Sequence, residues 1–290
     1  MKEIVIISGK GGTGKSSICA ALADLLQEDL VVADCDVDAA DLHLILSPQA
    51  SSSEDFYSGL IASIDPDKCI NCGICKTACR FDAIELINDQ HIVSGLDCEG
   101  CGYCYHVCPQ EAISLEEQKV GQFMISETRF GCDLVHAHLG IGADNSGKLV
   151  AKVKSIAKDH GKKLNKNLLL VDGSPGIGCP VISSLSGADY VIYVTEASLS
   201  GLSDLQRVHE LVAKFQVPGA CIVNKADINP TVADKIHRFL TREKILHVGD
   251  IPYSEDFPKA ISMGRTLIEE NSEWWTPVFT KIWQAIKEKI

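Results

Sequence analysis

The sequence lacks any hydrophobic run long enough to cross a bilayer, and it lacks an excess of positive charge. Its longest apolar stretches, such as Leu168–Val171 and Tyr190–Val194, are only a few residues long, whereas a transmembrane helix needs roughly 20. Lys and Arg number 27 against 39 Asp and Glu, for a formal net charge of −12. This charge argues against duplex-DNA binding through bulk charge, although it leaves a local basic patch open. We therefore expect no nucleic-acid partner and no stable membrane insertion.

The amino terminus lacks the shape of a signal peptide, because MKEIVIISGK runs directly into a short apolar stretch and a glycine-rich loop. We therefore expect a cytoplasmic protein. Disulfides do not persist in that compartment, so the 13 cysteines indicate metal binding rather than a disulfide framework. The 290 residues, 46% of them apolar, are enough for one large α/β domain or for two domains.

The chain begins with a strand, a loop, a helix and a second strand. Glu3–Ile7 and Leu30–Ala33 are short buried-strand patterns, and Ser16–Leu26 between them has helical periodicity. The α/β pattern breaks at the polar stretch Ser47–Ser53, which we interpret as a linker, and it resumes after Lys119. We predict an α/β fold with a doubly wound, mostly parallel sheet. The P-loop domain would comprise residues 1–60 and 119–290, and a small inserted α+β domain would span residues 61–118.

A glycine-rich loop joins the first strand to the first helix. Residues 9–16, GKGGTGKS, match the pattern G-x-x-x-x-G-K-S/T. Glycines let successive backbone N–H groups point at a phosphate, and the amino end of the following helix adds to the attraction. Lys15 would neutralise phosphate charge, and the Ser16 hydroxyl would ligate Mg²⁺. The predicted nucleotide-binding residues of this segment are Gly9, Lys10, Gly11, Gly12, Thr13, Gly14, Lys15, Ser16 and Ser17.

The loop contains an extra lysine, Lys10. The sequence K-G-G-x-G-K-S resembles the deviant Walker A loop of the MinD/ParA/nitrogenase-iron-protein superfamily. The resemblance implies an ATP- and Mg²⁺-binding dimer in which Lys10 reaches the nucleotide of the partner subunit. A solvated loop lysine is the alternative.

Two further segments are similar to that superfamily. The D-C-D sequence at 34–36 follows the second strand and implies that Asp36 orients the attacking water or the Mg²⁺ shell. LLVDGSPG at 169–176 looks like the Walker B and switch II segment. This similarity implies that Asp172 acts in the second shell of Mg²⁺ and that Gly176 senses the γ-phosphate. Weaker candidates for the role of Asp36 are Asp38 and Asp41.

The tetrapeptide Asn224–Asp227, N-K-A-D, follows another predicted strand and would lie beside the base. It also resembles the guanine-reading motif of GTPases. The superfamily implies adenine, contacted by the Asn224 amide, with Asp227 close by. The motif alone leaves ATP and GTP both open, and a polar turn without a ligand remains the alternative.

The cysteines between residues 69 and 108 form a repeat. CINCGICKTACRFDAIEL begins at Cys69, and CEGCGYCYHVCPQEAISL begins at Cys98. Each copy is the bacterial ferredoxin run, in which three cysteines hold one cluster and the fourth is a ligand of the other cluster. Zinc sites with four thiolates favour two separated C-x₂₋₄-C pairs instead. We predict two 4Fe–4S clusters, one held by Cys69, Cys72, Cys75 and Cys108 and the other by Cys98, Cys101, Cys104 and Cys79.

The first copy departs from the pattern at Arg80, where a proline usually follows the last cysteine. Among the other cysteines, Cys179 lies seven positions after Asp172, the offset of a ligand of the subunit-bridging cluster in the nitrogenase iron protein. With Cys132 it would supply a metal site on a dimer axis. Inert thiols are the competing interpretation. Pro277–Ile290 has one apolar face, which we expect to belong to the core rather than to a membrane anchor.

The joint presence of both motif sets resembles MinD-superfamily ATPases with an inserted ferredoxin domain. The resemblance implies a dimer, with itself or with a paralogue, that couples ATP turnover to electron transfer through two 4Fe–4S clusters. The redox partner or metal-cluster client is left open. One alternative is a scaffold ATPase that assembles or delivers metal clusters, as Mrp-type proteins do. A cell-division positioning ATPase is a further alternative, against which the acidic charge argues.

Overall fold

We describe a computed structural model of the chain, covering residues 1–36, 41–140 and 146–290. Asp38, a candidate from the sequence, lies outside these residues. The chain divides into two compact units. Unit 1 contains residues 1–54, 123–138 and 146–290, and unit 2 contains residues 55–122 and 139–145.

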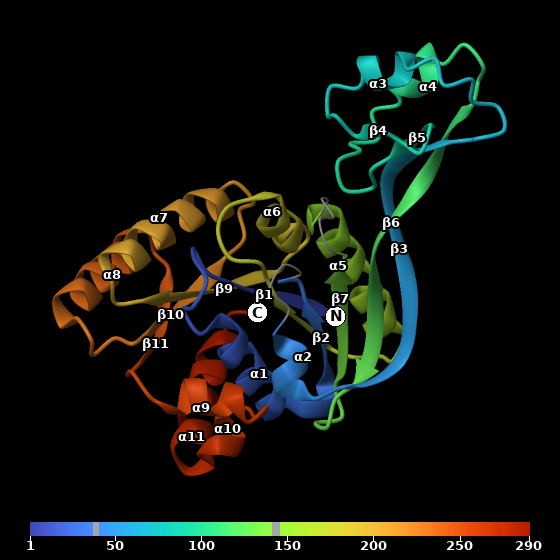
Figure 1. Ribbon diagram of the computed structural model, residues 1–290. Helices are drawn as coiled ribbons and strands as arrows, with labels where there is room; N and C mark the ends of the chain where they lie inside the picture. Colours follow the sequence, from blue (N-terminus) through green and yellow to red (C-terminus); the bar gives the residue numbers. More distant parts are fainter. Residues whose placement is uncertain (37–40, 141–145) are drawn as a thin grey trace. The chain divides into compact units, whose positions relative to one another are not determined.

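The described residues form a nine-stranded sheet in the order β11-β10-β9-β1-β8-β2-β7-β6-β3 (Figure 1). The pairs from β11 to β7 are parallel. The strands are β1 (Lys2–Ile7), β2 (Leu30–Asp34), β3 (Gln49–Ile64), β6 (Ile113–Glu127), β7 (Asp133–Leu139), β8 (Leu168–Asp172), β9 (Tyr190–Glu196), β10 (Gly219–Asn224) and β11 (Leu246–Ile251). This sheet confirms the predicted doubly wound, mostly parallel α/β fold.

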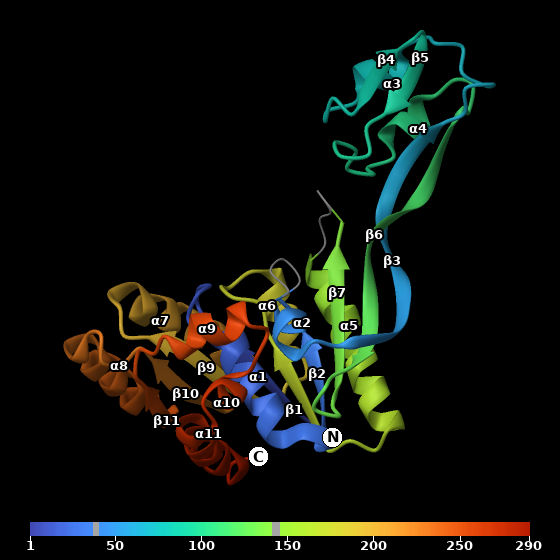
Figure 2. The same cartoon turned by 60° about the horizontal axis from the view of Figure 1, so that its bottom comes forward.

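Helices cover both faces of the sheet in unit 1, with α5 to α8 on one face and α1, α9, α10 and α11 on the other (Figures 1 and 2). Their bounds are α1 (Lys15–Leu26), α2 (Leu42–Leu46), α5 (Ser146–Lys163), α6 (Cys179–Leu185), α7 (Leu199–Ala213), α8 (Pro230–Arg242), α9 (Asp256–Ser262), α10 (Leu267–Glu270) and α11 (Ser272–Lys287). Among the described residues, no helix combines the length and apolarity that crossing a membrane requires.

On one face of the sheet, the core of unit 1 forms between the central strands and helices α1 and α11. Strands β1, β2 and β8 are buried along their length except for Lys2, as expected for parallel strands covered on both faces. From α11, Trp275, Phe279 and Ile282 are at most 2% exposed within this core. The apolar face of the carboxyl-terminal segment is therefore a core face, as the sequence predicted.

Unit 2 contains two short helices, α3 (Ile74–Ala78) and α4 (Tyr103–Val107), and an antiparallel hairpin of β4 (Ile84–Ile87) and β5 (Gln90–Val93). The helices begin 29 residues apart, and each follows a glycine in the same left-handed conformation. Gly73 and Gly102 both have φ 74° and ψ 2°. The sequence repeat is therefore also a repeat of backbone geometry, which favours glycine at these two positions because φ is positive.

One prediction about local structure is wrong. The polar stretch Ser47–Ser53 is not a linker, because β3 begins at Gln49 and continues to Ile64. The strand β6 likewise extends from Ile113 to Glu127. Serines carry a weak strand signal by themselves, and pairing with a neighbouring strand in the sheet overrides it.

Candidate functional site

The glycine loop between β1 and α1 is shaped by contacts that exclude side chains. A Cβ atom at Gly9 would lie 2.4 Å from the Cβ of Asp204 on α7, and one at Gly14 would lie 2.6 Å from the Asn224 amide nitrogen. Gly12 and Gly14 have φ values of 78° and 91°, which glycine adopts without strain. Around Gly12 a Cβ atom would meet nothing within 4 Å. The loop is therefore packed at its ends and open at its centre, which suits a bound anion.

Lys15 is the buried cation of this loop. Its Nζ lies 2.7 Å from Asp172 Oδ1 at the end of β8 and 3.3 Å from Asp36 Oδ2, just beyond β2. The structure thus brings together three of the predicted catalytic residues. Burial by itself lowers the pKa of Lys15, but the charges of Asp172 and Asp36 outweigh it and raise the pKa above its usual value. Burial, followed by the charge of Asp172, raises the pKa of Asp34.

The residues around Lys15 fit Mg²⁺ and a phosphate group. The carboxylates of Asp36 and Asp172 contact the Lys15 ammonium group, and the charge of Asp34 adds to theirs. Among the described residues, Asp34 Oδ2, Asp172 Oδ2 and Thr13 Oγ1 are buried side-chain oxygens without a hydrogen-bond partner. Buried oxygens of this kind normally have partners, and a hard divalent cation with its water shell prefers oxygen ligands. Ser16, in the first turn of α1, is half-buried, whereas Ser17 is buried.

Lys10 is held within its own chain by Glu196, at the carboxyl end of β9. The Lys10 Nζ lies 2.6 Å from Glu196 Oε1, and it donates to Ser200 Oγ at 2.9 Å. Lys225 Nζ lies 2.9 Å from Glu196 Oε2 and donates to the Gly12 carbonyl at 3.0 Å. Burial acts to raise the pKa of Glu196, but hydrogen bonds from Lys10 and Lys225 prevail and lower it to about 2.

Glu196 and the contact of Lys225 were not predicted from the sequence. A signal was present, because Glu196 follows an apolar strand and the carboxyl ends of parallel strands share one edge of the sheet. Nothing in the spacing indicated that this carboxylate would face Lys10.

The end of β8 and the segment after it are hydrogen-bonded to the ends of both neighbouring strands, β1 and β2. Gly176 N donates to the Ser8 carbonyl at 2.9 Å, Ser174 Oγ donates to the Cys35 carbonyl, and Cys35 N donates to the Asp172 carbonyl at 2.8 Å. Gly176 has φ 92° and open space around it. A movement of this segment would therefore disturb hydrogen bonds at the carboxyl ends of β1 and β2.

The N-K-A-D segment braces the glycine loop from the side of β10. The Asn224 amide is buried, donates to the Thr13 carbonyl at 2.8 Å and accepts from Lys225 N at 2.9 Å. Asp227 is exposed, and its Oδ1 accepts from Tyr253 N at 2.6 Å. The tetrapeptide begins at the last residue of β10, which agrees with the prediction that it follows a strand. The contact of Asn224 with a base stays a prediction.

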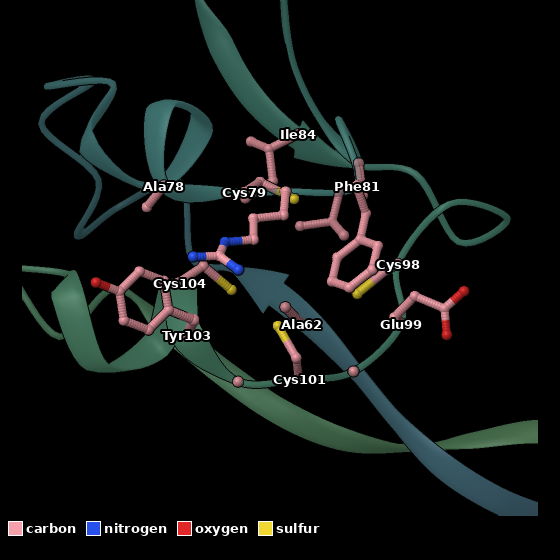
Figure 3. Close-up of a pocket in the computed structure, with 15 residues that line it drawn as sticks. Ala62, Ala78, Cys79, Phe81, Ile84, Cys98, Glu99, Cys101, Tyr103 and Cys104 are labelled. Atoms are coloured by element: carbon pink, nitrogen blue, oxygen red, sulfur yellow. The ribbon is translucent and has the colours of Figure 1, made fainter.

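In unit 2, the eight repeat cysteines line two pockets that match the two predicted ligand sets. One pocket is lined by Cys79, Cys98, Cys101 and Cys104, and Figure 3 shows these four side chains around a common space. The other is lined by Cys69, Cys72, Cys75 and Cys108. In each set, three cysteines come from one copy of the repeat and the fourth comes from the other copy.

Both pockets fit an iron–sulfur cluster chemically. All eight cysteines are free thiols, and apolar side chains such as Ile84 and Ile113 pack against several of them. Burial raises the pKa of Cys75 and of Cys104, so a bound cation is what would favour their thiolate form. Arg80, which replaces the usual proline, lines the pocket of Cys79 and adds positive charge there.

The structure does not bring Cys132 and Cys179 together. Cys132 is fully buried immediately before β7, at the amino-terminal edge of the parallel strands, where its sulfur lies 3.1 Å from Thr128 Oγ1. Burial raises the pKa of Cys132. Cys179 is exposed at the first residue of α6, beyond the carboxyl end of β8. The two thiols therefore lie at opposite edges of the sheet.

A family model described as a 4Fe–4S dicluster domain matches residues 62–115. Two relatives from Methanocaldococcus jannaschii match along nearly the whole chain. The uncharacterized protein MJ0578 is 34% identical over 288 residues, covering 99% of this chain and 94% of the relative. The uncharacterized protein MJ0579 is 27% identical over 282 residues, covering 93% and 94%.

Among solved structures, the chain is similar to the septum site-determining protein MinD of Pyrococcus horikoshii in complex with Mg-ADP. The TM-score is 0.59 at 19% sequence identity, and the match covers 98% of this chain and 95% of that protein. At this identity the likeness establishes the fold.

Proposed function

We propose that the chain hydrolyses ATP and that the nucleotide state of a dimer controls electron transfer. The chain belongs to one family with the uncharacterized protein MJ0578, has the fold of MinD and contains a 4Fe–4S dicluster domain. The observation that carries the proposal is the Lys15 cluster. One buried ammonium group joins the glycine loop to Asp36 and Asp172, and the same polypeptide contains two four-cysteine pockets.

In this proposal the glycine loop holds the phosphates, with Lys15 on the β- and γ-phosphates and Ser16 on Mg²⁺. Binding of Mg-ATP would separate Lys15 from Asp172 and Asp36, because phosphate oxygens compete for the ammonium group. Asp36 would then orient the attacking water, Asp172 would hold the Mg²⁺ shell, and Gly176 would face the γ-phosphate. The similar MinD structure was solved in complex with Mg-ADP, which supports nucleotide binding by a protein of this fold.

We propose that the cysteine sets hold two 4Fe–4S clusters, each of which would carry one electron at low potential. Apolar residues such as Ile84 and Ile113 pack against several of these cysteines and would limit the access of water to bound clusters. The protein would thus deliver electrons to a partner in one nucleotide state and withhold them in the other.

The dimer would form with a second copy or with a paralogue. Two full-length relatives in one organism, at 34% and 27% identity, support the paralogue arrangement. A cluster scaffold of Mrp type is the second candidate. In the sequence, this second candidate was favoured mainly by a possible labile metal site at Cys132 and Cys179. Because these two thiols are far apart in the structure, that argument for a cluster scaffold is weaker.

Electron paramagnetic resonance tests the proposal. Dithionite-reduced, cluster-loaded protein is measured with and without Mg-ATP, together with its reduction potentials. We expect ATP to change the signals or potentials in the wild type and in Lys214→Ala, which alters an exposed lysine. Lys15→Ala should abolish the response. If bound ATP leaves the wild-type signals and potentials unchanged, electron gating is wrong.

A further inference from the structure

A cluster of three metal-binding side chains lies outside both the nucleotide loop and the cysteine pockets. His237 comes from α8, and His247 and Asp250 come from β11. The Nε2 atom of His237 lies 3.0 Å from Asp250 Oδ1, and that of His247 lies 2.9 Å from the same oxygen. The ligand atoms of all three residues lie within 4.8 Å of one another.

An irregularity in β11 places His247 and Asp250 on one face. Residues three apart on a regular strand point to opposite faces. Here Cys221 of β10 pairs with His247, but the next residue, Ile222, pairs with Gly249. Val248 is therefore an extra residue, as in a β-bulge.

The two residues between the candidate ligands both face the opposite side of the sheet. Val248 is buried in the core that includes α11, and a Cβ atom at Gly249 would lie 3.3 Å from Ile282 of α11. His247 and Asp250 are left facing α8. β-Bulges of this kind often re-aim side chains beside functional sites.

The third side chain is positioned by the packing of α8. This helix begins after its cap Asn229, and it buries Ala233, Ile236 and Leu240 against the sheet. His237 lies at the border of that face, and its side chain is 33% exposed. Its ring centroid lies 4.6 Å from that of His247. Helix packing and strand geometry therefore hold the three groups together at a surface that a cation can reach.

We propose that His237, His247 and Asp250 bind a divalent transition-metal ion of the zinc class. Two imidazole nitrogens and one carboxylate oxygen are a common ligand set for zinc, and three protein ligands leave one position for water. In a tetrahedral site with bonds of about 2.0–2.1 Å, neighbouring ligand atoms lie roughly 3.3 Å apart. Asp250 Oδ1 already lies 2.9 and 3.0 Å from the two nitrogens. The bound ion would cross-link α8 to the edge strand β11.

Equilibrium dialysis of cluster-loaded, full-length protein against zinc chloride tests this site, with zinc and iron counted per chain. We expect one zinc in the wild type at unchanged iron content and none at this site in His237→Ala/His247→Ala. Asp250→Asn should weaken binding by more than about tenfold, since losing a direct ligand should cost at least as much as losing an outer-shell partner. The matched control is His160→Ala, which breaks a single histidine–carboxylate pair with Asp133 and should leave zinc binding unchanged.

Zinc-edge X-ray absorption distinguishes this site from the cysteine pockets. We expect nitrogen and oxygen neighbours at about 2.0–2.1 Å and no sulfur at about 2.3 Å. The proposal is overturned if the wild type takes up no zinc, if the double variant retains the same zinc, or if the zinc neighbours are sulfur.

Discussion

Lys10 and Lys15 lie five positions apart in one loop, yet they are held by different carboxylates. Lys15 is buried against Asp172 and Asp36, whereas Lys10 is partly exposed and held by Glu196. To reach the nucleotide of a partner subunit, as the loop sequence implies, Lys10 would have to leave Glu196 of its own chain. The ion pair with Glu196 would therefore oppose dimer formation.

We predict that Glu196→Gln strengthens ATP-dependent dimerisation, because a neutral amide holds Lys10 less strongly than a carboxylate does. Light scattering after size-exclusion chromatography, with ATP added, measures the dimer. Lys10→Ala should prevent the dimer. Lys214→Ala, which alters an exposed lysine, is the control and should leave the dimer fraction unchanged. An unchanged dimer fraction in Glu196→Gln would contradict the role of this ion pair.

We predict that His136 makes the stability of unit 1 depend on pH. Burial, with a smaller contribution from His43, lowers the pKa of His136 to about 4, against about 6.5 in an unfolded chain. As the pH falls below about 6.5, His136 becomes protonated in the unfolded state but stays neutral in the native state. The free energy of unfolding therefore decreases until the pH reaches about 4, where the native state is protonated as well. Between pH 7 and pH 5 this loss is about 2 kcal/mol.

His136→Gln should remove that part of the pH dependence. Glutamine stays neutral and still offers a hydrogen bond to Ser126, which lies 3.1 Å from His136 Nε2. Urea unfolding followed by tryptophan emission at pH 7 and pH 5 measures the difference. His138→Gln, an exposed position on the same strand, should keep the wild-type dependence. Equal slopes in all three proteins would contradict the assignment.

At the scale of elements, the apolar face of α11 could belong to the core or could bind a membrane, and the structure places it in the core. Phe279 is fully buried, so Phe279→Ala should lower the free energy of unfolding by about 3–5 kcal/mol. Urea unfolding followed by circular dichroism measures this loss. Lys281→Ala, at an exposed position of the same helix, should change stability by no more than about 0.5 kcal/mol. Unchanged stability in Phe279→Ala, with loss of vesicle binding, would make the helix a membrane anchor instead.

Strands β3 and β6 are the elements that sequence periodicity described least well. Their polar residues, such as those from Ser51 to Glu54, lack the alternation typical of a half-buried strand. The hairpin of β4 and β5 was also not predicted from the sequence. Asn88 and Asp89 form its turn, with φ values of 49° and 59°. Such residues tolerate the left-handed conformation that a two-residue hairpin turn requires.

At the scale of the whole molecule, the two units differ in what stabilises them. In unit 2, the described core contains few buried apolar residues, among them Ile84 and Ile113, packed against cysteines. A small domain with so little core would depend on the proposed clusters for folding. Unit 1 has an extensive core of its own.

We therefore predict that removing iron with a chelator unfolds unit 2 and leaves unit 1 folded. Limited proteolysis should then cleave between residues 61 and 118. The emission of Trp274, Trp275 and Trp283, all on α11 of unit 1, should not change. Untreated protein in the same buffer is the control. Loss of the tryptophan signal, or continued protection of unit 2, would contradict the prediction.

The sequence by itself determined the chemistry that depends on spacing along the chain. The glycine loop lies within eight consecutive residues, and each ferredoxin run places four cysteines within one short segment, so both motifs were predictable. The fold class followed from the same motifs and from the alternation of strands and helices.

Only the tertiary structure decided which distant side chains meet. The pairing of Lys10 with Glu196, the separation of Cys132 from Cys179 and the convergence of His237 with Asp250 depend on strand order, helix packing and one extra residue in β11. These contacts join residues far apart in sequence. Their geometry arises from the packing of whole elements, which no local pattern of residues records.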